Sequence, residues 1–125
     1  MIKPRGFTLI ELMIALVIVA VLASIALPSY RESVKRGNRR AAQSVMMDIV
    51  NREHQYFLGN RAYATKAELA YGLPPEVSSN YSYDITLDAG PPPGFDITFT
   101  AIGGQVSDGD VTVDSEGVKT PADKW

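Results

Sequence analysis

The chain of 125 residues contains no cysteine, which excludes a disulfide framework and any metal site built on thiolate ligands. Its only histidine is His54, and no nucleophile elbow, P-loop, dinucleotide fingerprint or His-Glu-x-x-His motif accompanies it. A lone histidine on a helix is solvated or packed far more often than it is catalytic. We therefore expect no enzymatic activity and no cofactor.

Basic residues are scarce in the second half of the chain. Residues 62–125 contain three lysines and ten acids, whereas residues 1–61 contain nine basic residues and four acids. The net charge of −2 conceals this asymmetry. A basic half joined to an acidic half indicates two different environments, and it argues against a chain that binds nucleic acid along its whole length.

Polar residues are almost absent between Phe7 and Leu27. The exceptions are Thr8, Glu11 and Ser24. A helix of this length, at about 1.5 Å per residue, reaches roughly 30 Å, the thickness of the hydrocarbon core of a bilayer. A helix that is apolar on every side is hard to enclose within so short a chain. We therefore predict a membrane-inserted helix over residues 7–30, kinked at Pro28 because proline removes an internal hydrogen bond.

An ordinary secretory signal peptide is the alternative for this segment. Lys3 and Arg5 would form its basic start, and Ser24-Ile25-Ala26 its small-residue cleavage site. Two features argue against it: Glu11 lies inside what would be the apolar region, and the stretch is longer than the roughly 7–15 residues typical of such a region. In a membrane helix a carboxylate costs about 2.5–3.5 kcal/mol on insertion scales, so Glu11 needs a reason to be there. The simplest reason is that Glu11 favours the positive end of the helix dipole or lies at headgroup depth.

The remaining chain, residues 31–125, is expected to form one globular domain. An amphipathic continuation of the helix is predicted over about 31–58, a loop over 59–80 with a short helical turn near Lys66, and strands over about 81–88, 95–102 and 110–114. The apolar stripe of the helix contains Ala42, Val45, Met46, Ile49, Tyr56 and Phe57. The apolar faces of the two longer strands contain Tyr81, Tyr83, Ile85 and Leu87, and Phe95, Ile97, Phe99 and Ala101. Stripe and strands predict an α+β fold in which the helix packs on a small antiparallel sheet.

The N-terminal stretch resembles the prepilin signal of the type IV pilin family. A short basic leader ends in Gly6 and is followed by Phe7-Thr-Leu-Ile-Glu11-Leu, and the apolar tract closes with Ala-Leu-Pro28-Ser-Tyr. The order of long helix, loop and antiparallel sheet is also similar to that family. The resemblance is close over residues 1–30 and architectural over the rest.

The resemblance implies a processed filament subunit, with residues 1–6 as the leader. A prepilin peptidase would cut between Gly6 and Phe7 and methylate the new amine of Phe7, and Glu11 would promote assembly by meeting the amine of a neighbouring subunit. The precursor would cross the inner membrane once, with its C-terminal domain outside the cytoplasm, and would meet an assembly platform there. It would then join other pilins in a filament for motility, adhesion or DNA uptake. A pseudopilin of a type II secretion or competence system is the alternative within the family.

The chain departs from the pattern of the type IV pilin family at two places. Ala20 stands where many relatives have glycine, so loosening of the helix between Ala20 and Pro28 is not assured. Without a disulfide, residues 106–125 must be held in another way.

Asp108, Asp110 and Asp114 are candidate calcium ligands, although their spacing does not match an EF-hand. The basic run within residues 31–40 could attract anionic lipid or DNA. We expect these residues to lie at headgroup level and on the solvated face of the helix rather than to bind DNA.

Overall fold

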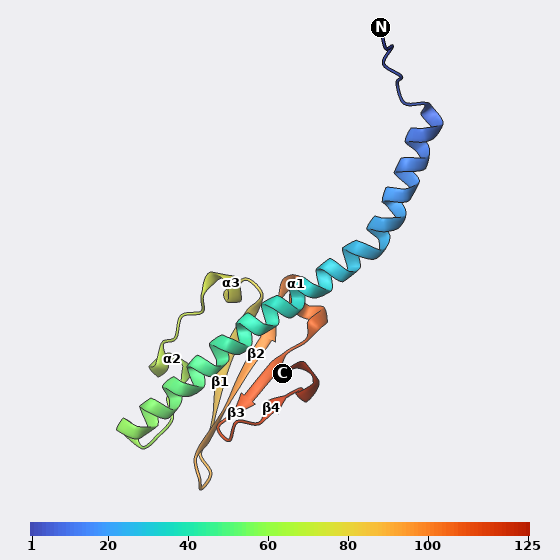
Figure 1. Cartoon of the computed structure of the whole chain (residues 1–125). Coiled ribbons are helices and arrows are strands. Elements are labelled where there is room, and N and C mark those ends of the chain that lie inside the picture. Colours follow the sequence, from blue (N-terminus) through green and yellow to red (C-terminus); the bar gives the residue numbers. More distant parts are fainter. The chain divides into compact units, whose positions relative to one another are not determined.

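The computed structural model describes residues 1–125 and divides into two compact units, Met1–Val34 and Lys35–Trp125. One helix, α1 (Leu9–Asn60), runs through both units (Figure 1). The eight residues before α1 have no regular secondary structure. The predicted domain boundaries, with a leader ending at residue 6 and a globular domain beginning at residue 31, stay predictions.

The first unit is an apolar helix with nothing packed on it. No residue from 1 to 34 is buried, and α1 is long and apolar enough there to cross a membrane. The hydroxyl of Ser24 donates to the carbonyl of Val21 at 2.7 Å, and that of Ser29 donates to Ile25 at 3.2 Å. These bonds satisfy both hydroxyls inside the helix, as apolar surroundings require. Pro28 lies within α1, and the kink there stays a prediction.

The second unit contains a four-stranded antiparallel sheet in the order β1-β2-β3-β4 (Figure 1). The strands are β1 (Tyr81–Asp88), β2 (Gly94–Ala101), β3 (Val111–Asp114) and β4 (Lys119–Thr120). The first three lie within one residue of the segments whose apolar and polar residues alternate. The two-residue β4 carries no such signal, because both of its side chains are exposed.

The core lies between the sheet and the second half of α1. The helix contributes Ala42, Met46, Ile49 and Val50, the short helix before the sheet contributes Val77, and the inward positions of β1, β2 and β3 contribute the rest. This arrangement confirms the predicted α+β class. Leu87 was expected on the apolar face of β1 but is 42% exposed. It stands at the end of an edge strand and lines a small surface hollow with Arg61 instead of the core.

Four short elements join the larger ones. The loop after α1 contains α2 (Lys66–Leu69), near the predicted helical turn, and α3 (Pro75–Ser78). Two 3₁₀ helices follow the sheet strands, η1 (Gly103–Asp108) and η2 (Ala122–Lys124). The sequence did not predict α3, η1 or η2, because segments of three to six residues are too short to show helical periodicity.

Candidate functional site

The start of α1 brings Glu11 against Thr8. The Thr8 backbone N–H and its hydroxyl both donate to Glu11 Oε2 at 2.8 Å. The Glu11 N–H donates to the Thr8 hydroxyl at 3.3 Å. These bonds form a capping box, which satisfies amides that the first turn of a helix leaves without partners. The sequence carried the signal, Ser/Thr-x-x-Glu before an apolar run, and the interpretation of Glu11 as an assembly residue missed it.

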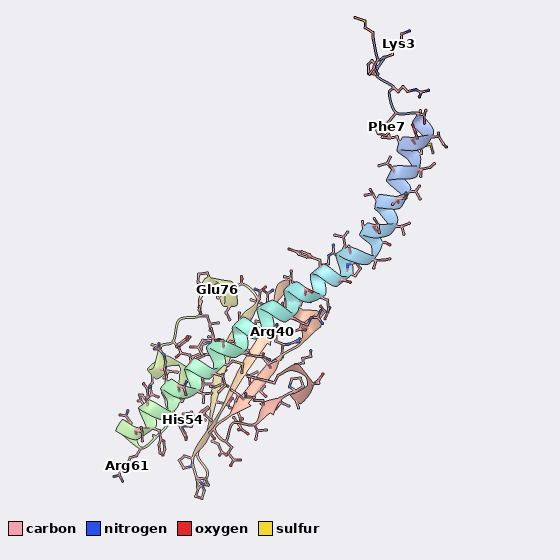
Figure 2. The ribbon with its side chains drawn as sticks, in the orientation of Figure 1. Lys3, Phe7, Arg40, His54, Arg61 and Glu76 are labelled. Carbon is pink, nitrogen blue, oxygen red and sulfur yellow. The ribbon has the colours of Figure 1, made fainter.

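The expected processing site lies just before this cap. Gly6 has no other part of the chain within 4 Å of where a Cβ would stand, and Phe7 is 88% exposed. Figure 2 shows Phe7 at the beginning of α1. The bond between Gly6 and Phe7 is therefore not covered by any other part of the chain. Cleavage between these residues, methylation of Phe7 and the assembly role of Glu11 stay predictions.

A buried glutamine in η1 forms hydrogen bonds with α1. Gln105 is 1% exposed, and its Nε2 donates to the carbonyl of Lys35 at 2.9 Å and to the Tyr81 hydroxyl at 3.0 Å. The Asn38 amide donates to Gln105 Oε1 at 3.2 Å. Burial raises the pKa of Tyr81 above its ordinary value, because desolvation disfavours the charged phenolate.

An ion pair completes this attachment. Arg39 donates to Asp108 Oδ1, and Gln105 Nε2 donates to Asp108 Oδ2 at 3.2 Å. Asp108 is 6% exposed. We call the four residues Asn38, Arg39, Gln105 and Asp108 the polar clamp. A further bond, from Gln43 Nε2 to the carbonyl of Lys124 at 2.6 Å, holds the C-terminal end on α1. These contacts join η1 and the C-terminal end to α1 without a disulfide.

The three candidate calcium ligands are bound to the protein in three different places. Asp108 belongs to the polar clamp, and Asp110 accepts the backbone N–H of Ala101 at 2.9 Å. Asp114 Oδ1 accepts the backbone N–H groups of Glu116 and Val118 at 2.9 and 2.8 Å. No three His, Asp or Glu side chains are grouped so that they could hold a metal ion. The geometry therefore gives each acid a structural role.

Two neighbouring residues near the end of α1 differ sharply in burial. His54 is exposed, and its ring meets those of Tyr63 and Phe95 edge-on, with centroids 6.1 and 5.7 Å apart. Glu53 is fully buried, and its Oε2 accepts the N–H of Ala64 at 2.8 Å while Oε1 has no partner. Desolvation raises the pKa of Glu53, although the Ala64 bond opposes this. Glu53 was not anticipated, because a glutamate on a helix is usually solvated.

Comparison with known proteins agrees with this geometry. The model of a family described as "Type IV minor pilin ComP, DNA uptake sequence receptor" matches residues 28–111. The model of the prokaryotic N-terminal methylation motif matches residues 1–27. The chain therefore belongs to the type IV pilin family, in the group of the first model. The predicted family is confirmed.

Several curated proteins are similar to this chain over part of their length. The type IV major pilin protein PilA of Myxococcus xanthus is 33% identical over 88 residues, which are 70% of this chain and 40% of that protein. The type II secretion system core protein G of Escherichia coli is 36% identical over 50% of this chain and 43% of its own length. The type IV wide pilus major component PilA4 of Thermus thermophilus is 34% identical, with shares of 57% and 56%. The chain thus spans about half the length of the curated relatives it matches.

Proposed function

We propose that this chain is a structural subunit of a type IV pilus-like filament. The carrying observation is the apolar start of α1, which is long and apolar enough to cross a membrane and lies in a segment, residues 1–34, without a single buried side chain. Lipid covers such a helix in a membrane. Outside the membrane, only neighbouring subunits can cover it, so a bundle of these helices is the natural core of a filament.

Processing at Gly6 and Phe7 prepares the helix for this assembly. Removal of the leader by a prepilin peptidase takes away Lys3 and Arg5 and leaves an amine on Phe7, which methylation keeps protonatable. The methylation-motif match over residues 1–27 supports this step. The subunit then waits as a single-pass inner-membrane protein, with residues 35–125 outside the cytoplasm, until an assembly platform adds it to the filament.

Glu11 serves assembly through its charge, which pairs with the Phe7 amine of a neighbour in apolar surroundings. Pairing offsets part of the desolvation of both groups. The capping box gives the same residue a second, structural role. The two roles separate chemically, because glutamine at this position keeps the cap but carries no charge.

Two single variants test the mechanism. Glu11→Gln retains the cap and loses the charge, so we expect normal membrane insertion and a filament yield reduced at least about tenfold, as for a lost interaction of about 1.4 kcal/mol. Thr8→Ala loses the two cap bonds made by the hydroxyl and retains the Glu11 charge. This change costs the helix about 1 kcal/mol of stability and is expected to leave assembly largely intact. Yield is measured by quantitative mass spectrometry of sheared filaments. Wild-type yield from Glu11→Gln would refute the pairing, and chain absent from every filament fraction would refute the filament function.

Two other filament roles have support from particular observations. The similarity to secretion system protein G favours a pseudopilus subunit, and a chain confined to short periplasmic filaments would establish that role.

The matching family model names a DNA uptake sequence receptor. Lys119 and Lys124 form no ion pair in the chain, and the Lys119 ammonium lies 4.8 Å from the centroid of the Trp125 ring. Loss of DNA uptake in Lys119→Ala/Lys124→Ala cells with normal filaments would establish DNA capture.

A further inference from the structure

The second unit carries unpaired charges of opposite sign at two separate places. Arg36 and Arg40 are exposed and lie one helical turn apart on α1. The chain contains two ion pairs, Arg39–Asp108 and Arg52–Asp48, so neither Arg36 nor Arg40 has an acidic partner within 4 Å. We call these two residues the arginine pair. Figure 2 shows Arg40 on α1, well separated from Arg61, which follows the last residue of that helix.

An acidic hollow lies beside the opposite end of the helix. It has a volume of about 580 Å³ and lies between the β1–β2 turn, the end of β3 and Tyr63. Its charged lining residues are Asp88, Asp96, Asp114 and Glu116, and no basic residue lines it. Tyr63 stacks on Phe57 in the last turns of α1, with ring centroids 4.7 Å apart, which fixes the hollow at this end.

Two of the four acids are free to bind a cation. Asp88 Oδ1 accepts the N–H of Gly90 at 3.0 Å, and Asp114 Oδ1 accepts two backbone N–H groups. Asp96 and Glu116 are exposed and take part in no ion pair. Arg61 lines a smaller adjoining hollow together with Asp88 but does not line the acidic hollow itself.

The chain cannot join these two surfaces within itself. About 20 residues of helix separate Arg40 from the end of α1, and at about 1.5 Å per residue this is roughly 30 Å. The two surfaces are therefore complementary only between molecules. Subunits that repeat along a filament axis offer such a contact when the end of one domain that carries the arginine pair faces the other end of a second domain.

We propose that the acidic hollow receives the arginine pair of a second copy of this chain. This inference rests on the proposed filament function and adds to it a contact outside the apolar helices. Arginine suits the role, because its planar guanidinium donates two parallel hydrogen bonds to a carboxylate. A single exposed ion pair contributes little, but the contact repeats at every subunit, and complementary charges of this kind set register and orientation.

Disulfide trapping tests the contact, since a chain without cysteine gives no background. Ser44 is exposed one turn beyond Arg40, and Ser115 lines the hollow. The full-length variant Ser44→Cys/Ser115→Cys, assembled in the producing cells, is expected to give disulfide-linked dimers and longer ladders on oxidation. The matched control Ser44→Cys/Ser82→Cys places the second thiol on the exposed face of β1 and is expected to give at least about tenfold less.

Charge exchange then identifies the partner residues. Arg36→Glu/Arg40→Glu and, separately, Asp96→Lys/Glu116→Lys are each expected to reduce the cross-link about tenfold or more, and the two changes combined in one chain are expected to restore it. Restoration also shows that the single changes did not act by unfolding the domain. Cross-linking that survives either reversal would overturn the proposal and leave the arginine pair to another anion, such as lipid phosphate. Loss without restoration would overturn it too.

Mass spectrometry of the same sheared filaments separates this proposal from the filament function. Chain present in filaments with an N-terminus at Phe7, but with a cross-link insensitive to charge, would refute the docking contact alone. Chain absent from filaments would refute the filament function, and the docking contact with it.

Discussion

Asp108 is the residue whose removal should reveal how this domain holds its C-terminal segment without a disulfide. Asp108→Ala leaves the Arg39 guanidinium without its carboxylate and takes away one of the partners of Gln105 Nε2. The side chains of the Arg39–Asp108 pair are 15% and 5% exposed, so both charges are largely removed from water. Breaking a buried pair by removing one partner costs about 3–5 kcal/mol.

The residual exposure of Arg39 places the expected loss at the lower end, about 3 kcal/mol. For a domain of this size about 1 kcal/mol shifts the melting temperature by about 4–8 °C, so we expect a decrease of more than about 10 °C. The full chain in detergent micelles is heated and followed by circular dichroism and by the fluorescence of Trp125, the only tryptophan. Because Gln43 ties the C-terminal end to α1, the fluorescence reports release of that end.

Asp48→Ala is the matched control, because it breaks an ion pair that is 54% and 50% exposed. Such i, i+4 pairs contribute about 0.3–0.5 kcal/mol. Asp108→Asn keeps the shape of the side chain and removes its charge, so its loss should fall between the two. If Asp108→Ala costs within about 1 kcal/mol of Asp48→Ala, the polar clamp does not hold the segment and the reasoning is wrong.

Two further predictions concern the core. Burial raises the pKa of Glu53 above its ordinary value of 4.5, so the free-energy cost of its charge is absent in acid and grows as the pH rises through that value. Glu53→Gln should therefore unfold at a higher denaturant concentration than the parent chain at pH 7, and the difference should shrink at pH 4. An equal difference at both pH values would contradict this. Ile97→Ala should lower the free energy of unfolding by about 2–5 kcal/mol, because Ile97 is fully buried. Leu87 is 42% exposed, so Leu87→Ala should lower it by less than about 1.5 kcal/mol. Equal losses in chemical denaturation would show that the two positions are packed alike.

The elements of this protein could be predicted because each one has a local cause. The run from Phe7 to Leu27 is apolar over its whole length, and only a helix satisfies its backbone without water. Alternation along residues 81–88 and 95–101 predicts strands with one buried face, and the structure places β1 and β2 there. The prepilin signal resides in consecutive residues, so the family could be inferred before any fold was known.

Contacts between distant residues could not be predicted in this way. Gln105 and Asp108 reach α1 across about 70 positions of sequence, and no periodicity relates them to Asn38 or Arg39. The Thr8 and Glu11 cap is different, since its spacing was visible. It was missed because the same glutamate had already been explained by the family signal.

The sequence by itself determined the membrane-length helix, the three longer strands and the processing signal, because hydrophobic periodicity and short motifs act over neighbouring residues. Only the tertiary structure decided that Glu53 is buried, that Leu87 is exposed and that a polar clamp holds η1. Burial depends on which segments meet in space, and the cost of burying a polar group depends on the partners it finds there. Tertiary packing also left Arg36, Arg40, Asp96 and Glu116 without partners in their own chain, and on them the proposed contact between subunits depends.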